Sequence, residues 1–306
     1  MNRDRKGAFL TLFGGFCWGA SGSMGQYLFT RQGMDSRWLV PIRLGLAGII
    51  LFLYCLKKYG VKKTFAPWRT KKDAVDLLIY GLAGISCCQF LYFLTIQLSS
   101  AAIGTILQDL SPVMILLVSC MMAKRKPLFN EILSIILALV GVFLLTTHGS
   151  LDSLSVPVSA LITGVLCAVC VTIYNVEPKH LLDTYPVTLL QGWAFLLGSS
   201  MFTLIFRPWT FHYVPNGMGL LGIAFVVVVG NVLAFTAYMT GVALIGPEKG
   251  ILYGFAEPVT AAVISTTMLG SHFTIYDALG FACIFLMMVC ISWKPEHSSK
   301  TQTAGR

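Results

Sequence analysis

Residues 92–114 read YFLTIQLSSAAIGTILQDLSPVM, and residues 238–260 read YMTGVALIGPEKGILYGFAEPVT. Aligned without a gap, the two segments share identical residues at five positions, which include Tyr92 with Tyr238, Gly104 with Gly250, and Pro112 with Pro258. The same register continues through residues 123–146 and 269–292, where Glu131 falls over Asp277. The chain therefore contains an internal repeat.

Further matches extend the repeat toward the N-terminus when small gaps are allowed. They pair Cys17 with Cys167, Asp35 with Asp183, and Arg43 with Gln191. We therefore predict two halves, residues 7–147 and residues 157–293. Residues 294–306 follow as a tail that we expect to be cytoplasmic.

Composition indicates that both halves are embedded in lipid. Of 306 residues, 56% are apolar and only 11% are charged, whereas a soluble domain carries about 25% charged residues. The apolar residues form blocks of about twenty, the length of a helix that crosses roughly 30 Å of hydrocarbon. Lipid offers the backbone no hydrogen-bond partners, and the blocks lack the alternation of barrel strands. We predict an all-α integral membrane protein.

Ten segments are expected to span the membrane: 7–30, 38–56, 74–96, 100–122, 130–147, 157–177, 187–206, 217–242, 247–269 and 274–293. The first follows basic residues, as a signal peptide does, but it is long and has no small-residue cleavage site, so we expect it to be retained. Each half holds five helices. Because five is odd, the second half starts on the opposite side of the membrane, and the repeat is inverted. Inverted repeats are typical of secondary transporters.

The net charge of +9 is concentrated on one side of the predicted membrane. If the N-terminus is cytoplasmic, the inner segments hold 18 of the 22 Lys and Arg residues. The outer loops hold Arg31, Arg37 and Arg207, and Arg43 lies within a span. Basic residues mark cytoplasmic loops. We therefore expect both termini in the cytoplasm of a cell-membrane protein, with the bilayer rather than nucleic acid as its partner.

Several other classes of protein lack their sequence signals here. The nine cysteines lie within or at the edge of apolar spans, where thiols act as small packing residues. Cys167 and Cys170 have CxxC spacing without a second ligand pair, so we expect no metal site and no cofactor. The absence of HExxH, GxGD and Walker A motifs disfavours a membrane-embedded enzyme and ATP-driven transport. A channel would show rings of like residues, and none is visible.

The architecture resembles that of the drug/metabolite transporter superfamily, and specifically its EamA-type family. The resemblance rests on the five-plus-five repeat, on Trp18-Gly19 in the first helix, and on a proline in the fourth helix of each half followed by Glu131 or Asp277 at the fifth. It implies a carrier of amino acids, amines, nucleobases, sugars or drugs, often outward and often coupled to protons. The second half departs from the pattern, with Ala168-Val169 in place of Trp18-Gly19.

Three charged residues at membrane depth are the first candidates for a site: Arg43, Asp109 and Glu257. Each costs about 2.5–3.5 kcal/mol to insert, so such residues normally face a bundle interior or a water-filled path. Low dielectric penalises an ionised carboxyl group, so we expect Asp109 and Glu257 to be candidates for proton coupling. The alternative is an inert ion pair between Arg43 and one carboxylate, which would leave the other carboxylate unpaired.

Both carboxylates are followed by a proline, Pro112 and Pro258. Proline removes an amide donor and disturbs the helix, and the freed carbonyl groups are tolerated at this depth only beside protein or a cavity. The two prolines are therefore candidate hinges around a central site. The alternative is that they bend the helices without moving, as many membrane prolines do.

Polar and aromatic residues at the same level complete the candidate substrate site. Besides Arg43 they are Trp18, Ser21, Gln89, Tyr92, Tyr174, Asn175, Gln191, Trp193, Asn231, Tyr238 and Tyr253. Taken alone, each residue is as well explained by an interhelical hydrogen bond or by a role as interfacial anchor as by binding of a substrate. We read the glycine pairs Gly15/Gly19 and Gly250/Gly254 as packing positions.

A site of mixed charge suits an amphoteric small molecule. Arginine grips a carboxylate with two hydrogen bonds, and a carboxylate receives an amine, so we expect an amino acid or a related compound. The alternative substrate is an organic cation, amine or drug held by carboxylates and aromatic faces. The carrier is expected to act as a monomer or homodimer.

Overall fold

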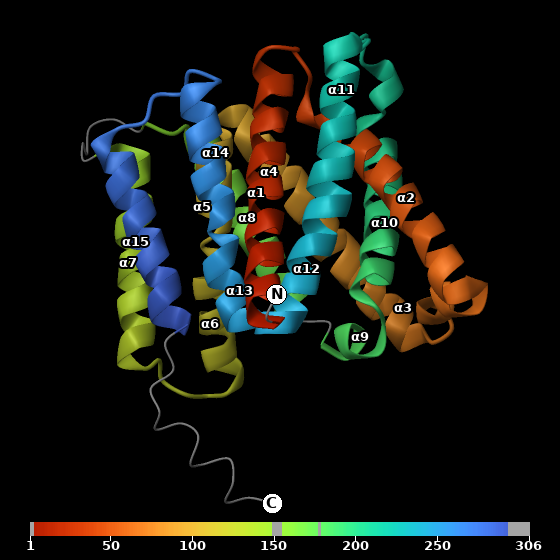
Figure 1. The fold of residues 1–306 in the computed structure, drawn as a ribbon, viewed down its shortest axis with the longest axis horizontal. Helices are drawn as coiled ribbons and strands as arrows, with labels where there is room; N and C mark the ends of the chain where they lie inside the picture. Colours follow the sequence, from red (N-terminus) through yellow and green to blue (C-terminus); the bar gives the residue numbers. More distant parts are fainter. Residues whose placement is uncertain (1–2, 149–154, 177–178, 293–306) are drawn as a thin grey trace, which may run out of the picture.

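The computed structural model describes residues 3–148, 155–176 and 179–292, and these residues contain helices but no strand (Figure 1). The first half holds α1 (Arg3–Thr30), α2 (Ser36–Thr64), η1 (Ala66–Trp68), α3 (Lys71–Leu78), η2 (Ile79–Ser86), α4 (Cys87–Leu98), α5 (Ala101–Gln108), α6 (Ser111–Met122) and α7 (Phe129–Thr147). The second half holds α8 (Val158–Val176), α9 (Lys179–Thr184), α10 (Val187–Phe206), η3 (Pro208–Thr210), α11 (Gly217–Phe225), η4 (Val226–Leu233), α12 (Ala234–Ile245), α13 (Pro247–Gly254), α14 (Ala256–Thr267) and α15 (Ile275–Ser292). The predicted tail at residues 294–306 lies outside the described residues.

Each of the ten segments expected to span a membrane is occupied by a helix or by helices in series, which confirms the all-α fold. Eight stretches in the described part of the chain are long and apolar enough to cross a bilayer, with bounds Ser36–Trp68, Lys71–Leu98, Ala101–Met122, Phe129–Thr147, Val158–Val176, Val187–Phe206, Gly217–Ile245 and Ile275–Ser292. The other two expected passages are α1 and the α13–α14 pair, which run beside them in the bundle (Figure 1). Length and composition therefore identify eight membrane-spanning stretches in the described residues, and the total of ten spans stays a prediction.

Polar side chains fix where several helices begin. The Asp35 side chain accepts a hydrogen bond from the amide of Arg37 at the start of α2, and Ser100 accepts one from Ile103 at the start of α5. Thr70 and Asn216 cap α3 and α11 in the same way. Such caps satisfy amides that have no partner within the helix. The loops between spans can therefore be short.

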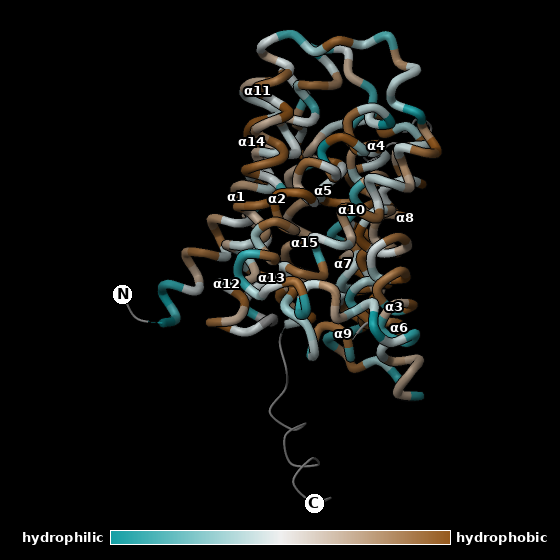
Figure 2. Tube along the Cα trace, turned by 90° about the vertical axis from the view of Figure 1, so that its right-hand side faces the viewer, coloured by the Kyte–Doolittle hydropathy of each residue, from teal (hydrophilic) through white to brown (hydrophobic). Residues whose placement is uncertain are grey.

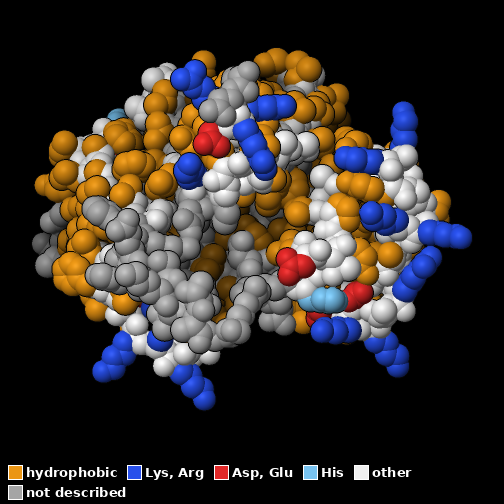
Figure 3. All heavy atoms as spheres, turned by 60° about the horizontal axis from the view of Figure 1, so that its bottom comes forward, with side chains coloured by type: hydrophobic (Ala, Val, Ile, Leu, Met, Phe, Trp, Pro, Cys, Tyr) orange, Lys and Arg blue, Asp and Glu red, His pale blue; other side chains and the backbone are white. Residues whose placement is uncertain are grey.

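The apolar residues of this fold cover its outside as well as its inside. Large side chains such as Leu139, Leu204 and Phe9 are 67%, 73% and 59% exposed, as is expected where lipid is the solvent. Hydrophilic residues gather toward the two ends of the bundle (Figure 2). Lys and Arg side chains project from the end that carries the N-terminus, here called the N-terminal face (Figure 3).

Helices from the two halves pack in antiparallel pairs. Along α1 and η4–α12, Gly7 lies against Leu244 at one end and Ser21 lies against Gly230 further along. The counterpart contact joins α8 to η2–α4, where Thr95 Oγ1 donates to Thr163 Oγ1 at 2.9 Å. In both pairs, sequence numbers rise along one helix as they fall along the other.

Two further pairs join a helix directly to its own counterpart. In α2 and α10, Ser199 Oγ donates to the carbonyl of Pro41 at 2.8 Å, and Gly192 lies against Leu51. In α7 and α15, Asn130 Nδ2 donates to the carbonyl of Cys290 at 3.1 Å. Both pairs are antiparallel, since Gly141 of α7 also lies against Ile284 of α15.

Glycines allow α1 to approach α13 and α14 closely, which confirms their reading as packing positions. A methyl group added at Gly19 would overlap the carbonyl oxygen of Glu257, and one at Gly15 would lie 3.1 Å from the carbonyl oxygen of Gly254. Between lipid-embedded helices such close van der Waals packing takes the place of the hydrophobic effect. Gly19 therefore sets how near α1 comes to the backbone of Glu257.

The third and fourth helices of both halves are irregular at matching positions. The third helix of each half contains a π-helical stretch, η2 in the first and η4 in the second. The fourth is interrupted just before its proline, between α5 and α6 and between α13 and α14. π-Helical turns are frequent at functional sites.

Candidate functional site

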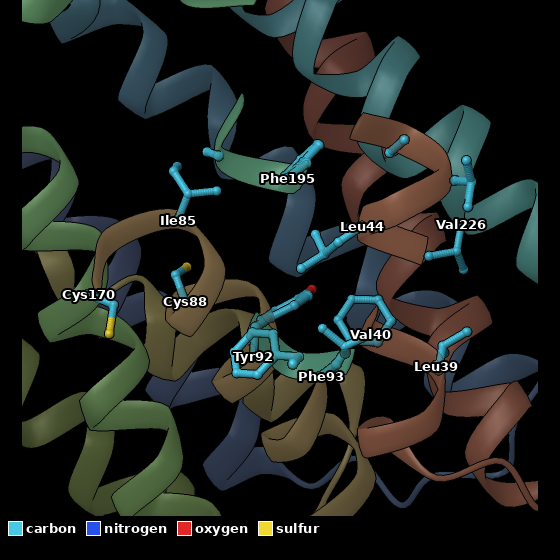
Figure 4. Packing of buried hydrophobic residues seen from close by; sticks show 14 of the residues in the cluster. Leu39, Val40, Leu44, Ile85, Cys88, Tyr92, Phe93, Cys170, Phe195 and Val226 are labelled. Atoms are coloured by element: carbon cyan, nitrogen blue, oxygen red, sulfur yellow. The ribbon is translucent and has the colours of Figure 1, made fainter. Parts of the chain in front are cut away.

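Arg43 is buried near the N-terminal end of α2, with 1% of its surface exposed. Its Nη1 donates to Oδ1 of Asn231 on η4 at 3.2 Å, and its Nη2 donates to Oε1 of Gln89 on α4. The Phe93 ring lies under the guanidinium, with Cζ 3.6 Å from the ring centroid. Phe93 and Tyr92 belong to the hydrophobic core of the bundle, together with Val40 and Leu44 (Figure 4).

Two hydrogen-bond donors in this cluster have no partner in the described residues. They are Arg43 Nε and Asn231 Nδ2, both fully buried. Since Asn231 uses its oxygen to accept from Arg43, its NH₂ group lies close to the guanidinium. A buried donor without a partner costs about 1–3 kcal/mol, so this pair is suited to a ligand that brings an acceptor.

The expected alternative of an inert ion pair is not formed. In the described part of the chain, neither Asp109 nor Glu257 lies within 4.0 Å of the Arg43 nitrogens. The charge of Arg43 is instead held by two amide oxygens and an aromatic face. Arg43 is therefore a buried cation without a carboxylate partner among these residues.

The two carboxylates lie at the interruptions of the fourth helices. Glu257 is in the first turn of α14, and its Oε1 accepts a hydrogen bond from the hydroxyl of Tyr92 at 3.3 Å. Asp109 directly follows α5 as its C-cap, and its Oδ2 is buried without a partner in the described residues. Both candidate hinge prolines lie in the first turn of the helix that follows the interruption. The structure thus places an unsatisfied acceptor and a second carboxylate at matching levels of the two halves.

Other predicted site residues surround this centre. The Trp18 and Tyr238 rings lie 4.8 Å apart, and the Tyr238 hydroxyl donates to the carbonyl of Gly250 at 3.2 Å. Ser21 packs against Gly230, next to Asn231 in η4. Gln191 lies on α10 as Arg43 lies on α2, and its Oε1 accepts from Tyr80 on η2 at 3.4 Å. Both contacts therefore join the second helix of one half to the third helix of the other.

The remaining predicted residues have other contacts. Tyr174 packs on Gly84 with its ring 6.3 Å from that of Tyr80, and Tyr253 is half-buried. Asn175 is exposed, and its Nδ2 donates to the carbonyl of Val171 in its own helix at 2.8 Å. Trp193 Nε1 donates to the carbonyl of Thr64 at the N-terminal face. Asn175 and Trp193 therefore lie apart from the Arg43 cluster.

The structure adds residues that the sequence did not single out. Phe93 supplies the face under Arg43, although it follows Tyr92 in an unbroken apolar run. Gln108 accepts from the thiols of Cys88 and Cys167, whose sulfur atoms are 3.7 Å apart. Gln108 precedes Asp109 directly, which was the one signal in the sequence that could have drawn attention to it.

Comparison with known proteins identifies the family of the chain. The model of the EamA-like transporter family matches the chain twice, over residues 5–147 and residues 158–293. YicL, an uncharacterized inner membrane transporter of Salmonella typhimurium, is 34% identical over 292 residues, which cover 95% of this chain and 97% of that protein. YyaM, an uncharacterized transporter of Bacillus subtilis, is 26% identical over 276 residues, which cover 86% of this chain and 87% of that protein.

A solved structure shares the fold. One crystal structure of another protein, 17% identical in sequence, covers 92% of this chain and 94% of its own with a TM-score of 0.63. The two family matches fall on the two halves predicted from the repeat and together take in nearly the whole chain. This multi-pass membrane protein therefore belongs to the EamA-like transporter family.

Proposed function

We propose that the protein is a secondary active transporter that moves a small polar metabolite outward by alternating access between two inverted five-helix repeats. The antiparallel course of α2 against α10 and of α7 against α15 supports inverted halves. The double family match supports two repeats of one design. Ten spans, with α1 and α13–α14 as the ninth and tenth, place both termini on the same side. The basic residues of the N-terminal face support a cytoplasmic location for that side.

The substrate is an amino acid or a related amphoteric compound. The observation that carries this proposal is Arg43, a buried cation with an unpaired Nε beside the unpaired Nδ2 of Asn231. These donors suit a carboxylate, which guanidinium groups bind with two hydrogen bonds. At the helix interruptions, Asp109 Oδ2 and the Glu257 carboxylate suit an ammonium group.

Proton coupling follows from the same carboxylates. Glu257 on α14 accepts a hydrogen bond from Tyr92 of the other half, so gain or loss of its proton alters a contact between the halves. Asp109 has an oxygen without a partner in the described residues, which is available to bind a proton. Interruptions beside Pro112 and Pro258 supply points where the fourth helices can bend around the site.

A second candidate substrate is an organic cation or amine. The contact between the Trp18 and Tyr238 rings supports it, because an aromatic pair near carboxylates suits a positively charged group. Such a substrate would leave the donors of Arg43 and Asn231 unused. The two candidates therefore differ in whether Arg43 is needed for binding.

Purified protein in liposomes separates these candidates. Labelled amino acids and organic amines are screened for transport under an imposed pH gradient, with empty liposomes as the control. We expect saturable, gradient-dependent transport of an amphoteric compound. Transport of amines alone would support the second candidate, and transport of neither class would contradict the proposed function.

A further inference from the structure

Residues 57–72 form a basic segment that runs from the last turns of α2 through η1 to the start of α3. The segment holds seven basic residues and no acidic one. They are Lys57, Lys58, Lys62, Lys63, Arg69, Lys71 and Lys72, and all of them are exposed. Seven of the 22 Lys and Arg residues of the chain therefore lie in one short stretch.

The basic segment begins where the apolar part of α2 stops. The apolar block of residues 38–56 is long enough to cross roughly 30 Å of hydrocarbon, and α2 continues beyond it to Thr64. The end of α2 lies at the outer edge of the bundle, near the N-terminal face (Figure 1), and Lys and Arg side chains project from that face (Figure 3). In a membrane the basic segment would therefore lie at the level of the lipid headgroups.

Apolar side chains are exposed beside these cations. Val61 and Phe65 are 64% and 41% exposed, and Leu53 and Tyr54 near the end of the apolar block are exposed as well. Exposed apolar groups among lysines are typical of a surface between lipid and water, where the apolar groups enter the acyl region and the charges reach the headgroups. This combination favours a lipid surface over a soluble anion, which could neutralise the lysines but could not cover Val61 and Phe65.

The backbone of the basic segment is anchored to the second half. Gly60 has φ 76° and ψ 165°, a conformation that residues with a side chain rarely adopt, and it kinks the helix. Beyond this kink, the carbonyl of Thr64 accepts a hydrogen bond from Nε1 of Trp193 on α10 at 2.9 Å. The Phe65 and Trp68 rings pack edge-on against the Trp193 ring. The basic side chains therefore project from a backbone whose position is fixed by these contacts.

None of the seven cations has a carboxylate partner in the described part of the chain. The ion pairs found there involve other basic residues, namely Arg37, Arg125, His148 and His180. Lys58 donates to the neutral hydroxyl of Tyr54 at 2.8 Å. Lys71 and Lys72 begin α3, where the helix dipole disfavours positive charge. Neither ion pairs with the described residues nor the helix dipole accounts for the seven charges.

A second basic loop of the N-terminal face differs in this respect. In residues 124–126, Arg125 forms two hydrogen bonds of 2.7 Å with Glu131, so the protein itself neutralises part of the charge of this loop. Leu128, which follows the loop, is 46% exposed and is the counterpart of Val61 in the basic segment. The two loops therefore offer a matched comparison between few and many free cations.

We infer that residues 57–72 bind anionic phospholipid, with the lipid phosphate groups as partners of the lysines and with Val61 and Phe65 in the acyl region beneath them. Lys and Arg residues beside a span each add to the attraction of an anionic membrane surface, and salt weakens that attraction. The inference does not rest on the proposed function, because no substrate and no transport step enters it.

Fluorescence quenching in lipid nanodiscs tests the inference at the basic segment itself. Val61→Cys or, as the matched position, Leu128→Cys is labelled with bimane in a chain whose native cysteines are replaced. The nanodiscs hold phosphatidylglycerol and phosphatidylcholine in equal amounts, with bromine on the acyl chains of one lipid or of the other. The ratio of quenching by the two brominated lipids measures the local enrichment of anionic lipid. We expect this ratio to be about two- to threefold higher at position 61 than at position 128.

Replacement of lysines assigns the enrichment to the basic segment. The variant that combines four changes should lower the ratio at position 61 to that at position 128: Lys57→Gln, Lys62→Gln, Lys71→Gln and Lys72→Gln. Arginine at the same four positions should retain the enrichment, because the charge is kept. The control variant, Lys124→Gln with Lys126→Gln, should leave the ratio at position 61 unchanged.

Three results would overturn the inference. The first is an equal ratio at both positions in the chain with all its lysines, and the second is an enrichment that persists in the four-glutamine variant. The third is loss of the enrichment on addition of inorganic phosphate but not of sodium chloride at the same ionic strength, which would indicate a site for a soluble anion. If the four-glutamine variant does not fold, the comparison of the two positions still decides the outcome.

Discussion

The hydroxyl of Tyr92 on α4 donates a hydrogen bond to Oε1 of Glu257 on α14 at 3.3 Å. Tyr92 is 7% exposed and belongs to the first half, whereas Glu257 belongs to the second. A carboxylate that can gain and lose a proton thus bears directly on a contact between the two halves. The first prediction concerns this contact.

Tyr92→Phe removes the hydroxyl and keeps the buried ring. We expect a loss of about 1 kcal/mol in the free energy of unfolding. We also expect slower gradient-driven transport, because Glu257 no longer has its hydrogen bond to the other half. Tyr27→Phe is the matched control, since the Tyr27 hydroxyl accepts from Gln32 at 3.0 Å away from the site. Equal transport by the two variants in liposomes would count against a role for the Tyr92 contact.

Arg43→Lys keeps the buried positive charge and removes the planar guanidinium group with its several donors. A lysine ammonium cannot bond Asn231 and Gln89 in the same geometry or stack on Phe93. We expect substrate affinity to fall at least about tenfold, as for the loss of one charge-assisted hydrogen bond. The control is Arg37→Lys, whose exposed pair with Asp35 should matter little. Unchanged affinity, measured by binding to the purified protein, would favour an amine as substrate.

Gly19→Ala places a methyl group against the carbonyl oxygen of Glu257. We expect the overlap to cost about 1–3 kcal/mol of stability, as for other overpacked interfaces, and to lower the melting temperature in detergent. Gly217→Ala is the control, because a methyl group there meets nothing within 4 Å. Equal melting temperatures for both variants would show that α1 does not approach α14 this closely.

Orientation in the membrane can be read from two exposed positions. Single cysteines at Lys126 and His212, in a chain whose native cysteines are replaced, are labelled with a maleimide that does not cross membranes. We expect His212 to react in intact cells and Lys126 only after permeabilisation, because the basic loops lie in the cytoplasm. The reverse pattern would place both termini outside.

Much of the fold is predictable from the sequence because lipid imposes a simple rule on it. A twenty-residue apolar block must be a helix, so helices occupy all ten expected segments, although α2 runs on to Thr64, past the expected end at residue 56. The gapless alignment around Pro112 and Pro258 located the interruptions of both fourth helices. The π-helical stretches η2 and η4 could not be predicted, because a shifted hydrogen-bond register depends on packing against neighbours rather than on composition.

The charged residues at membrane depth could be picked out from the sequence, but their contacts could not. Charges at membrane depth identified Arg43, Asp109 and Glu257, because each is costly to insert. Pairing of Arg43 with a carboxylate was an open alternative, yet α2 packs on η4 and α4, which bring Asn231 and Gln89 to it. Asn175 faces outward in α8, and a helix that is apolar all round gives no sign of which face is inside.

The central claim is that Glu257 carries the proton that drives transport, and Glu257→Gln tests it most directly. Glutamine keeps the shape and an oxygen that can accept from Tyr92, but it cannot titrate. With a transported compound identified, uptake into liposomes is measured twice, once driven by a pH gradient and once as exchange of labelled for unlabelled substrate without a gradient. The account predicts that Glu257→Gln abolishes gradient-driven transport and retains exchange. Gradient-driven transport with unchanged pH dependence, in this variant and in Asp109→Asn, would contradict it.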